Sequence, residues 1–308
     1  LAFAGSPFPS VSVATEEYDS NINVITPAAW ASGGNLGTAR QRIGSAGTQT
    51  AGLAISGAPG TAGPNATAST EEYNGSSWAA GGSITNAAIG PFGFGTQTAA
   101  VGAGGYSNTN TVLNTTENYN GSTWTSSGIM STARIDGGSA GTQTAGLIFG
   151  GRPGVTAATE EYDGSSWTAG GSLGTAKYLQ AGAGTQTAGL AAGGGPGVTA
   201  ATEEYDGSAW TAGGTMNTAR NSNAGGGLQT AAVSFGGLTP SVSGVTEQYD
   251  GTSWVSTTSM STARKGLGGC GTQTSALGFG GYNGSTNVTT TEEFTGGTSI
   301  TTASDLTT

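Results

Sequence analysis

The chain consists of short runs of small and apolar residues separated by turn sequences. In one unit, residues 145–151 are small and apolar and end in a double glycine, and Thr-Glu-Glu-Tyr follows at residues 159–162. Asp163-Gly164 is a strong hairpin turn signal, and Trp167 lies in the segment after it. No stretch of useful length has the 3.6-residue apolar period of a helix. The pattern predicts four short strands per unit.

The unit is repeated along almost the whole chain, because three markers recur in register. One marker is a tryptophan, found at Trp30, Trp78, Trp124, Trp167, Trp210 and Trp254. The Gln of a Gly-Thr-Gln-Thr element, with Leu228 replacing the first Thr in one copy, keeps the same spacing at Gln49, Gln97, Gln143, Gln186, Gln229 and Gln273. Thr-Glu-Glu-Tyr or a close variant has seven copies, whose aromatic residues are Tyr18, Tyr73, Tyr119, Tyr162, Tyr205, Tyr249 and Phe294.

Four short strands in 43 to 48 residues match the size of a β-propeller blade. Seven segments fit a second strand: residues 1–5, 53–57, 99–105, 146–151, 189–194, 231–237 and 276–281. Only six segments fit a first strand, because the chain opens on a second strand. We therefore predict that residues 1–308 form a single all-β domain, a seven-bladed propeller whose first blade lacks its first strand. That blade would stay open or be closed from outside this sequence. The alternative is six blades with extra edge strands.

The unit resembles the kelch repeat of β-propellers. Kelch repeats have a double glycine at the end of the second strand, Tyr-Asp in the third and Trp in the fourth. An apolar residue follows that Trp by six positions and a basic residue by ten. Trp167 is followed in this way by Leu173 and Lys177, whereas the copy of Trp78 has Ala88 in place of the basic residue. The first copy carries an insertion between residues 19 and 30. The resemblance implies a kelch-type ring.

Composition and charge exclude several classes of function. Of 308 residues 59 are Gly, yet spaced aromatic residues indicate a packed core rather than disorder. The net charge of −10 would repel a phosphate backbone, so we expect no nucleic-acid partner. No apolar run is long enough to span a bilayer, so we expect no membrane insertion. The start lacks Met, and we expect a mature piece or fragment of a longer chain.

The chain offers little for catalysis. His is absent and Cys270 is the only cysteine, which removes His-based acid–base chemistry and Cys/His metal cages. Neighbouring residues of a strand point to opposite faces, so Glu160 and Glu161 would not form one site. We interpret one Glu per blade as the ion-pair partner of the basic residue ten positions after Trp. We therefore expect no enzyme activity, no metal and no cofactor.

The loops between the second and third strands vary in length and content, unlike the rest of the repeat. They span residues 58–69, 106–115, 152–158, 238–245 and 282–290. In a kelch-like propeller they emerge on one face beside the connections between blades, and variable loops often carry function. We take this face as the candidate binding surface, with a solvated rim that binds nothing as the alternative. Its larger members are Tyr106, Asn108, Asn110, Arg152 and Tyr282, joined across blades by Phe92 and Tyr178.

The amino-acid sequence of the repeat is also similar to repeats in virion structural and tail-fibre-like proteins of marine bacteriophages. Its core is Thr-Glu-Glu-Tyr-Asp-Gly-Ser-Ser-Trp-Thr-Ala-Gly-Gly together with Gly-Thr-Gln-Thr-Ala-Gly-Leu. This resemblance implies a virion-associated or extracellular adhesion module that binds host surface glycans. The alternative is a protein–protein scaffold that holds virion structural proteins or a peptide, with the open first blade accepting a partner strand.

Overall fold

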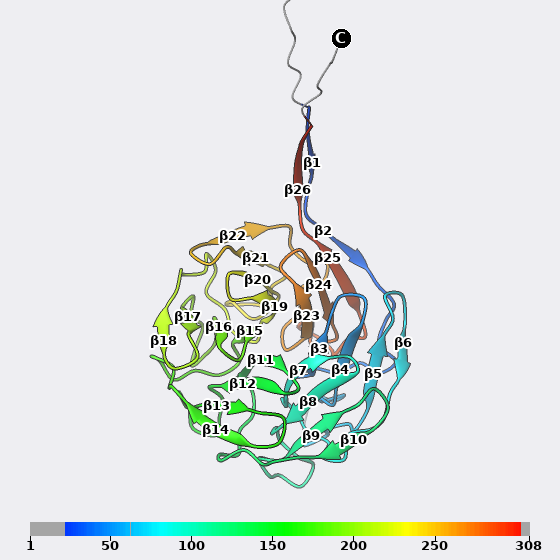
Figure 1. Ribbon diagram of the computed structural model, residues 1–308. Coiled ribbons are helices and arrows are strands. Elements are labelled where there is room, and N and C mark those ends of the chain that lie inside the picture. Colours follow the sequence, from blue (N-terminus) through cyan, green and yellow to red (C-terminus); the bar gives the residue numbers. More distant parts are fainter. Residues whose placement is uncertain (1–21, 62, 303–308) are drawn as a thin grey trace, which may run out of the picture. The chain divides into compact units, whose positions relative to one another are not determined.

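The structure, a computed structural model, describes residues 22–61 and 63–302. It divides into two compact units. In the smaller unit, strand β1 (Ile22–Thr26) pairs antiparallel with β26 (Thr298–Thr302), and Ile22 lies opposite Thr302. The larger unit, Ala28–Gly296, contains six four-stranded sheets, which are the blades of a β-propeller (Figure 1).

Each blade is an antiparallel sheet whose strands follow one another from the centre outward. The first strands are β3 (Gly44–Gly47), β7 (Phe92–Thr96), β11 (Gly138–Thr142), β15 (Ala181–Thr185), β19 (Ala224–Leu228) and β23 (Gly268–Thr272). The second strands are β4 (Gly52–Ile55), β8 (Ala99–Ala103), β12 (Ala145–Phe149), β16 (Ala188–Ala192), β20 (Ala231–Phe235) and β24 (Ser275–Phe279).

The third strands carry the Thr-Glu-Glu-Tyr marker: β5 (Thr70–Tyr73), β9 (Thr116–Tyr119), β13 (Thr159–Tyr162), β17 (Thr202–Tyr205), β21 (Thr246–Tyr249) and β25 (Thr291–Thr295). The fourth strands carry the Trp: β6 (Trp78–Ala80), β10 (Trp124–Ser126), β14 (Trp167–Gly170), β18 (Trp210–Ala212), β22 (Trp254–Thr257) and β2 (Ala29–Ser32). We number the blades 1 to 6 by the chain order of their first strands.

The prediction of seven blades is wrong, because β2 closes the ring within this chain. Strand β2 is the fourth strand of blade 6, where Trp30 lies opposite Phe294 as Trp78 lies opposite Tyr73 in blade 1. The open first blade is therefore also wrong. The seven-blade prediction places Trp30 in the same copy as Tyr18. Trp30 follows Tyr18 by twelve positions, however, and every other Trp follows its aromatic residue by five. Tyr18 and the segment 1–5 lie outside the described residues.

The marker side chains of each blade fasten it to the preceding blade. Every Trp donates its indole N–H to a Thr hydroxyl of the preceding third strand, at 2.9 to 3.0 Å, including Trp30 to Thr246. The Gly-Thr-Gln-Thr glutamines also donate to main-chain carbonyls of the preceding blade; Gln97, for example, donates to Gly52 and Tyr73. The aromatic residues and glutamines are thus explained by packing between blades.

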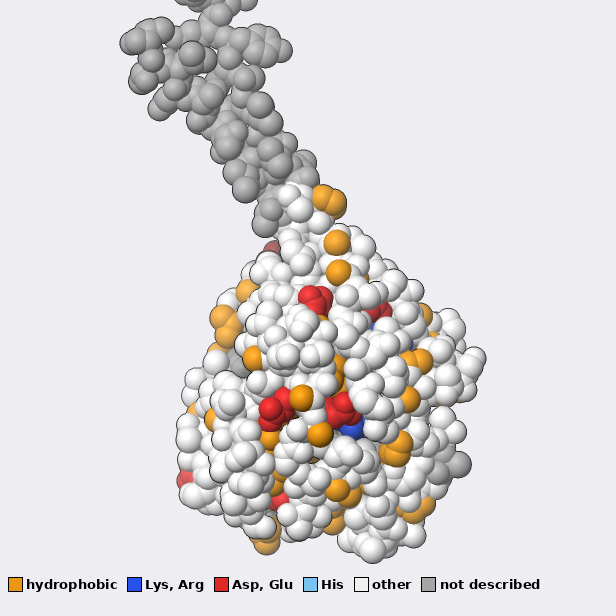
Figure 2. Space-filling view, turned by 90° about the vertical axis from the view of Figure 1, so that its right-hand side faces the viewer, with side chains coloured by type: hydrophobic (Ala, Val, Ile, Leu, Met, Phe, Trp, Pro, Cys, Tyr) orange, Lys and Arg blue, Asp and Glu red, His pale blue; other side chains and the backbone are white. Residues whose placement is uncertain are grey.

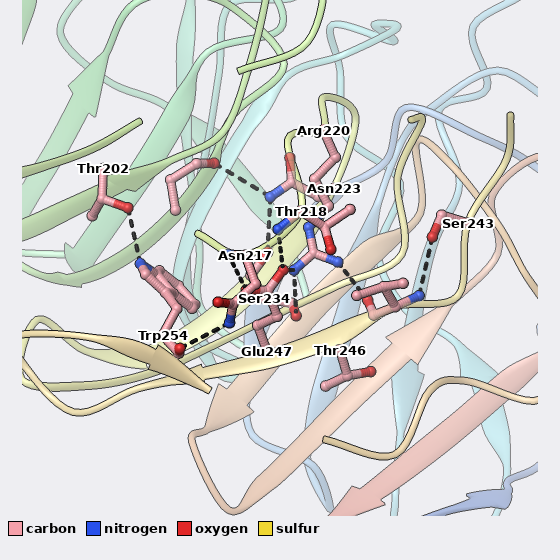
Figure 3. Close-up of polar contacts among 12 residues, drawn as sticks. Thr202, Asn217, Thr218, Arg220, Asn223, Ser234, Ser243, Thr246, Glu247 and Trp254 are labelled. Atoms are coloured by element: carbon pink, nitrogen blue, oxygen red, sulfur yellow. Dashed lines mark hydrogen bonds and ion pairs between the residues drawn. The ribbon is translucent and has the colours of Figure 1, made fainter. Parts of the chain in front are cut away.

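The two acidic positions of the marker have separate structural roles. In Figure 3, Glu247 accepts hydrogen bonds from the amides of Asn217 and Thr218 and pairs with Arg220 at 3.2 Å. Such a buried ion pair exists in five blades: Arg40–Glu71, Arg134–Glu160, Lys177–Glu203, Arg220–Glu247 and Arg264–Glu292. The predicted pairing is confirmed there. In blade 2, which has Ala88, Glu117 binds Thr85 and Asn86 instead.

The second acidic position accepts a hydrogen bond from the tyrosine of the next blade. Tyr249 donates to Glu204 at 2.5 Å, and burial together with this bond raises the pKa of Tyr249 to about 12. Blade 6 has Phe294, which has no hydroxyl, and there the preceding blade has Gln248 in place of Glu. In blade 5 the acid is therefore replaced where its donor is missing, whereas in blade 2 Asn118 stands in place of the Glu and accepts from Tyr162 at 3.1 Å.

Candidate functional site

The six first strands surround a central channel with a cavity of about 210 Å³. The strands are rich in glycine because their backbones lie very close together. A Cβ at Gly93 or Gly182 would collide with the backbone of Ser45 or Ser139 in the neighbouring blade. The lining is therefore mostly backbone, and the channel itself presents few side chains. Its chemistry is concentrated where the loops between blades arrive.

At that end, six equivalent residues form a ring that we call the mouth ring. Each donates its amide to the carbonyl of its equivalent in the preceding blade, at 2.6 to 3.0 Å, so that the backbone bonds form a closed circle. All six have a positive φ between 53° and 64°. The members of the mouth ring are Arg42, Gly90, Asp136, Leu179, Ser222 and Gly266. The four that are not glycine hold a left-handed conformation that costs about 1 kcal/mol or more each.

Around the mouth ring, each blade has one bridge between its incoming connection and the start of its loop between the second and third strands. The six bridges are Gln41–Ala58, Ile89–Tyr106, Ile135–Arg152, Tyr178–Gly195, Asn221–Leu238 and Lys265–Tyr282. The predicted residues Tyr106, Arg152 and Tyr282 therefore occupy equivalent positions around one opening, and Tyr178 lies on the other side of such a bridge, on the incoming connection of blade 4. All four are partly exposed.

Two of the predicted residues contact each other. The guanidinium of Arg152 lies over the Tyr178 ring, 5.6 Å from its centroid. Lys265 makes a similar contact across the bridge of blade 6, with its ammonium 5.5 Å from the centroid of Tyr282. Each contact places a cation against an aromatic face, a favourable electrostatic arrangement.

The predicted asparagines hold the loops. Asn108 donates to the carbonyl of Ala66 at 2.9 Å and accepts from its amide at 2.6 Å, which ties the loop of blade 2 to that of blade 1. The exposed Asn110 accepts a hydrogen bond from the hydroxyl of Tyr106 at 3.0 Å. Phe92 is only 2% exposed and lies in the core, so it does not reach this surface.

The centre of the site is a carboxylate shared by two guanidinium groups. Asp136 Oδ1 accepts from Arg42 Nε at 2.9 Å, and Oδ2 accepts from Arg152 Nε at 2.8 Å. The Arg42 side chain reaches Asp136 across Gly90, and a Cβ at Gly90 would collide with the carboxylate. The Asp136 side chain is 1% exposed, whereas those of Arg42 and Arg152 are 26% and 40% exposed. The cluster therefore presents guanidinium edges rather than its carboxylate.

Sequence reasoning missed Arg42 and Lys265. A signal was available, since five of the eight basic residues occupy the position ten residues after Trp and only Arg42, Arg152 and Lys265 do not. The geometry that brings these three residues of different blades to one opening depends on the closed ring.

Two observations on the described residues bear on metal binding and on nucleophilic chemistry. Within residues 22–61 and 63–302, no group of three or more Cys, Asp or Glu side chains could hold a metal ion. Burial raises the pKa of the Cys270 thiol to about 12, so this side chain is a poor nucleophile. The described part of the chain also has no helix that is long and apolar enough to cross a membrane. The face in Figure 2 is mostly backbone and uncharged polar side chains, with separate acidic spots.

The fold and site define the class: the protein is a β-propeller of six repeated four-stranded blades, a fold that usually serves as a binding or scaffold module. No protein-family model matches the chain, and no curated protein sequence matches it.

Proposed function

We propose that this propeller is a non-enzymatic adhesion module that binds saccharides of a host surface through the loop face around the mouth ring. The observation that carries the proposal is the group of partly exposed aromatic side chains, Tyr106, Tyr178 and Tyr282, which three blades contribute to the bridges around the mouth ring. Tyrosine offers an apolar face for a sugar ring and a hydroxyl for hydrogen bonds. The module would act on a virion or at an extracellular surface, as the resemblance to kelch-like repeats of phage virion proteins implies.

The loops support this function because they are tied together before any ligand arrives. Asn108 joins the loops of blades 2 and 1, and Asn287 donates to the carbonyls of Ala58 and Pro59, both at 3.0 Å, which joins the loops of blades 6 and 1. A face held in one conformation loses little entropy on binding. The absence of catalysis is part of the proposal, since the one carboxylate described at the mouth ring is already bound by two guanidinium groups.

The test is binding of the purified, labelled protein to a panel of marine bacterial cells, before and after periodate oxidation of their surface glycans. We expect saturable binding that periodate abolishes. Tyr178→Ala and Tyr282→Ala should weaken it, whereas Val255→Ala, a change at a 61% exposed side chain on an outer strand, should not. Periodate-resistant binding, or none above a control protein, would overturn the proposal.

A protein–protein scaffold remains the alternative function, but in a changed form. The partner strand was expected at an open first blade, and that edge does not exist because β2 completes blade 6. We therefore place the protein partner of this alternative on the loop face. Periodate-resistant binding to cells that protease treatment abolishes would favour this alternative.

A further inference from the structure

The basic side chains that do not belong to the buried ion pairs with Glu lie around the mouth ring. The sequence contains eight Lys and Arg, and five of them are 0–2% exposed in side-chain area and paired with Glu. The other three are Arg42, Arg152 and Lys265, and all lie at this one end of the channel. With Asp136 as the one acidic side chain in the cluster, the local charge is 3 − 1 = +2 on a protein whose net charge is −10.

The three cations occupy one sector of the opening. Lys265 precedes Gly266, whose carbonyl accepts the amide of Arg42 at 2.6 Å. Arg42 and Arg152 meet at the carboxylate of Asp136. The sector thus runs from blade 6 through blades 1 and 2 to blade 3. The remaining mouth-ring positions, in blades 4 and 5, are occupied by Leu179 and Ser222, which carry no charge.

The guanidinium groups keep donors for a ligand. Asp136 engages Nε and one Nη of each arginine. Among the residues that the structure describes, the other Nη of Arg42 and of Arg152 has no hydrogen-bond partner, and both side chains are partly exposed. The fixed fork of an arginine suits two oxygens of a carboxylate or sulfate group. Asp136 holds both arginines in place, which lowers the entropy cost of binding an anion.

We propose that the mouth ring binds an acidic saccharide, a sugar that carries a carboxylate or sulfate group. This inference rests on the proposed saccharide-binding function and names its ligand class. Arg152 over Tyr178 and Lys265 over Tyr282 each combine a cation with an aromatic face. A charged sugar unit has the complementary pair of features, an apolar C–H face and an oxyanion. A neutral sugar would leave the three cations unused.

The experiment compares binding of the whole chain to three immobilised polymers: polygalacturonate, dextran sulfate and unmodified dextran. The variants are Arg152→Gln and Lys265→Gln, neither of which breaks the contact between Arg42 and Asp136. Thr168→Glu is the matched control, because it lowers the net charge by the same amount at an exposed outer-strand position. Thermal unfolding of each variant checks that the fold is kept.

We expect the protein to bind at least one acidic polymer, with affinity that falls as salt is added, and to bind dextran weakly or not at all. Arg152→Gln and Lys265→Gln should each weaken binding about tenfold, and Thr168→Glu should leave it unchanged. Preference between polygalacturonate and dextran sulfate identifies the oxyanion as carboxylate or sulfate.

Three results would overturn the inference while leaving the proposed function standing. The first is equal binding of dextran and the acidic polymers, and the second is unchanged binding by both Arg152→Gln and Lys265→Gln. The third is periodate-sensitive binding to cells without binding to any acidic polymer. Loss of the proposed function itself would show separately, as absence of periodate-sensitive binding to cells.

Discussion

Closure of the ring by β2 predicts that Trp30 is as important for stability as a tryptophan inside the repeat. Trp78 is the matched comparison, because both side chains are partly buried and both donate to a Thr of the preceding blade. Trp30 lies 5.0 Å from the ring centroid of Phe235 and 5.1 Å from that of Phe294. Trp78 has equivalent partners at 4.8 and 5.0 Å. We therefore compare Trp30→Ala with Trp78→Ala.

The expected loss follows from what each substitution removes. Truncation of a buried tryptophan costs about 3–5 kcal/mol, and partial exposure places both residues near about 3 kcal/mol. Each variant also leaves a Thr hydroxyl without its indole donor. Urea unfolding followed by far-ultraviolet circular dichroism gives the free energy of unfolding of each variant. We expect the two losses to agree within about 1 kcal/mol, with unchanged m-values.

The two variants separate the closed ring from the seven-bladed alternative. If Trp30 lay on a loosely attached first copy, Trp30→Ala would behave as a surface change and cost less than about 0.5 kcal/mol, while Trp78→Ala still cost about 3 kcal/mol. That difference would refute closure by β2. Similar losses of unfolding free energy in Trp30→Ala and Trp78→Ala, with Val255→Ala unaffected, would support closure by β2.

Three further predictions concern the same contacts. Tyr249→Phe removes the donor to Glu204 and should lower the free energy of unfolding by about 1–3 kcal/mol in urea unfolding. Adding Glu204→Gln reproduces the natural pair of Gln248 in blade 5 and Phe294 in blade 6 and should recover most of this loss. No recovery would contradict the pairing. Ala29→Cys with Thr295→Cys, opposite each other in β2 and β25, should form a disulfide that raises the melting temperature until reduced; failure to cross-link would argue against this register. Because the pKa of Tyr249 is raised from 10 to about 12, its contribution to stability is complete below pH 10 and is lost as pH rises from 10 to 12. The part of the tyrosinate absorbance that Tyr249→Phe removes should therefore appear together with unfolding, and its appearance in the folded state at pH 10 would refute this prediction.

The blade itself was predictable because its signals are local. Strand order, the turn at Asp163-Gly164 and the ion pair between Lys177 and Glu203 follow from spacing within about one repeat. The number of blades was not predictable in the same way, since it depends on a contact between Trp30 and Phe294, which lie at opposite ends of the sequence. The extra marker at Tyr18 suggested a further blade, while the six tryptophans gave the correct number.

The candidate site was only partly predictable for a similar reason. The variable loops predict one face, and Tyr106, Arg152 and Tyr282 occupy equivalent positions at the start of three of these loops. The contact between Arg42 and Asp136 joins blades 1 and 3 across Gly90, so no spacing along the chain reports it.

Two rings of equivalent residues differ in how strictly their backbone conformation requires glycine. Near the other end of the first strands, six equivalent positions have φ between 98° and 111°, and all six are glycine: Gly47, Gly95, Gly141, Gly184, Gly227 and Gly271. That conformation is closed to other residues. The mouth ring has φ between 53° and 64°, which other residues adopt at a cost, and only two of its six members are glycine. Four side chains kept there together cost about 4 kcal/mol, a large share of the 5–15 kcal/mol that holds a typical domain folded. The ion pair between Arg42 and Asp136 offsets part of that cost. We interpret the remaining strain as the cost of keeping side chains at the opening for binding.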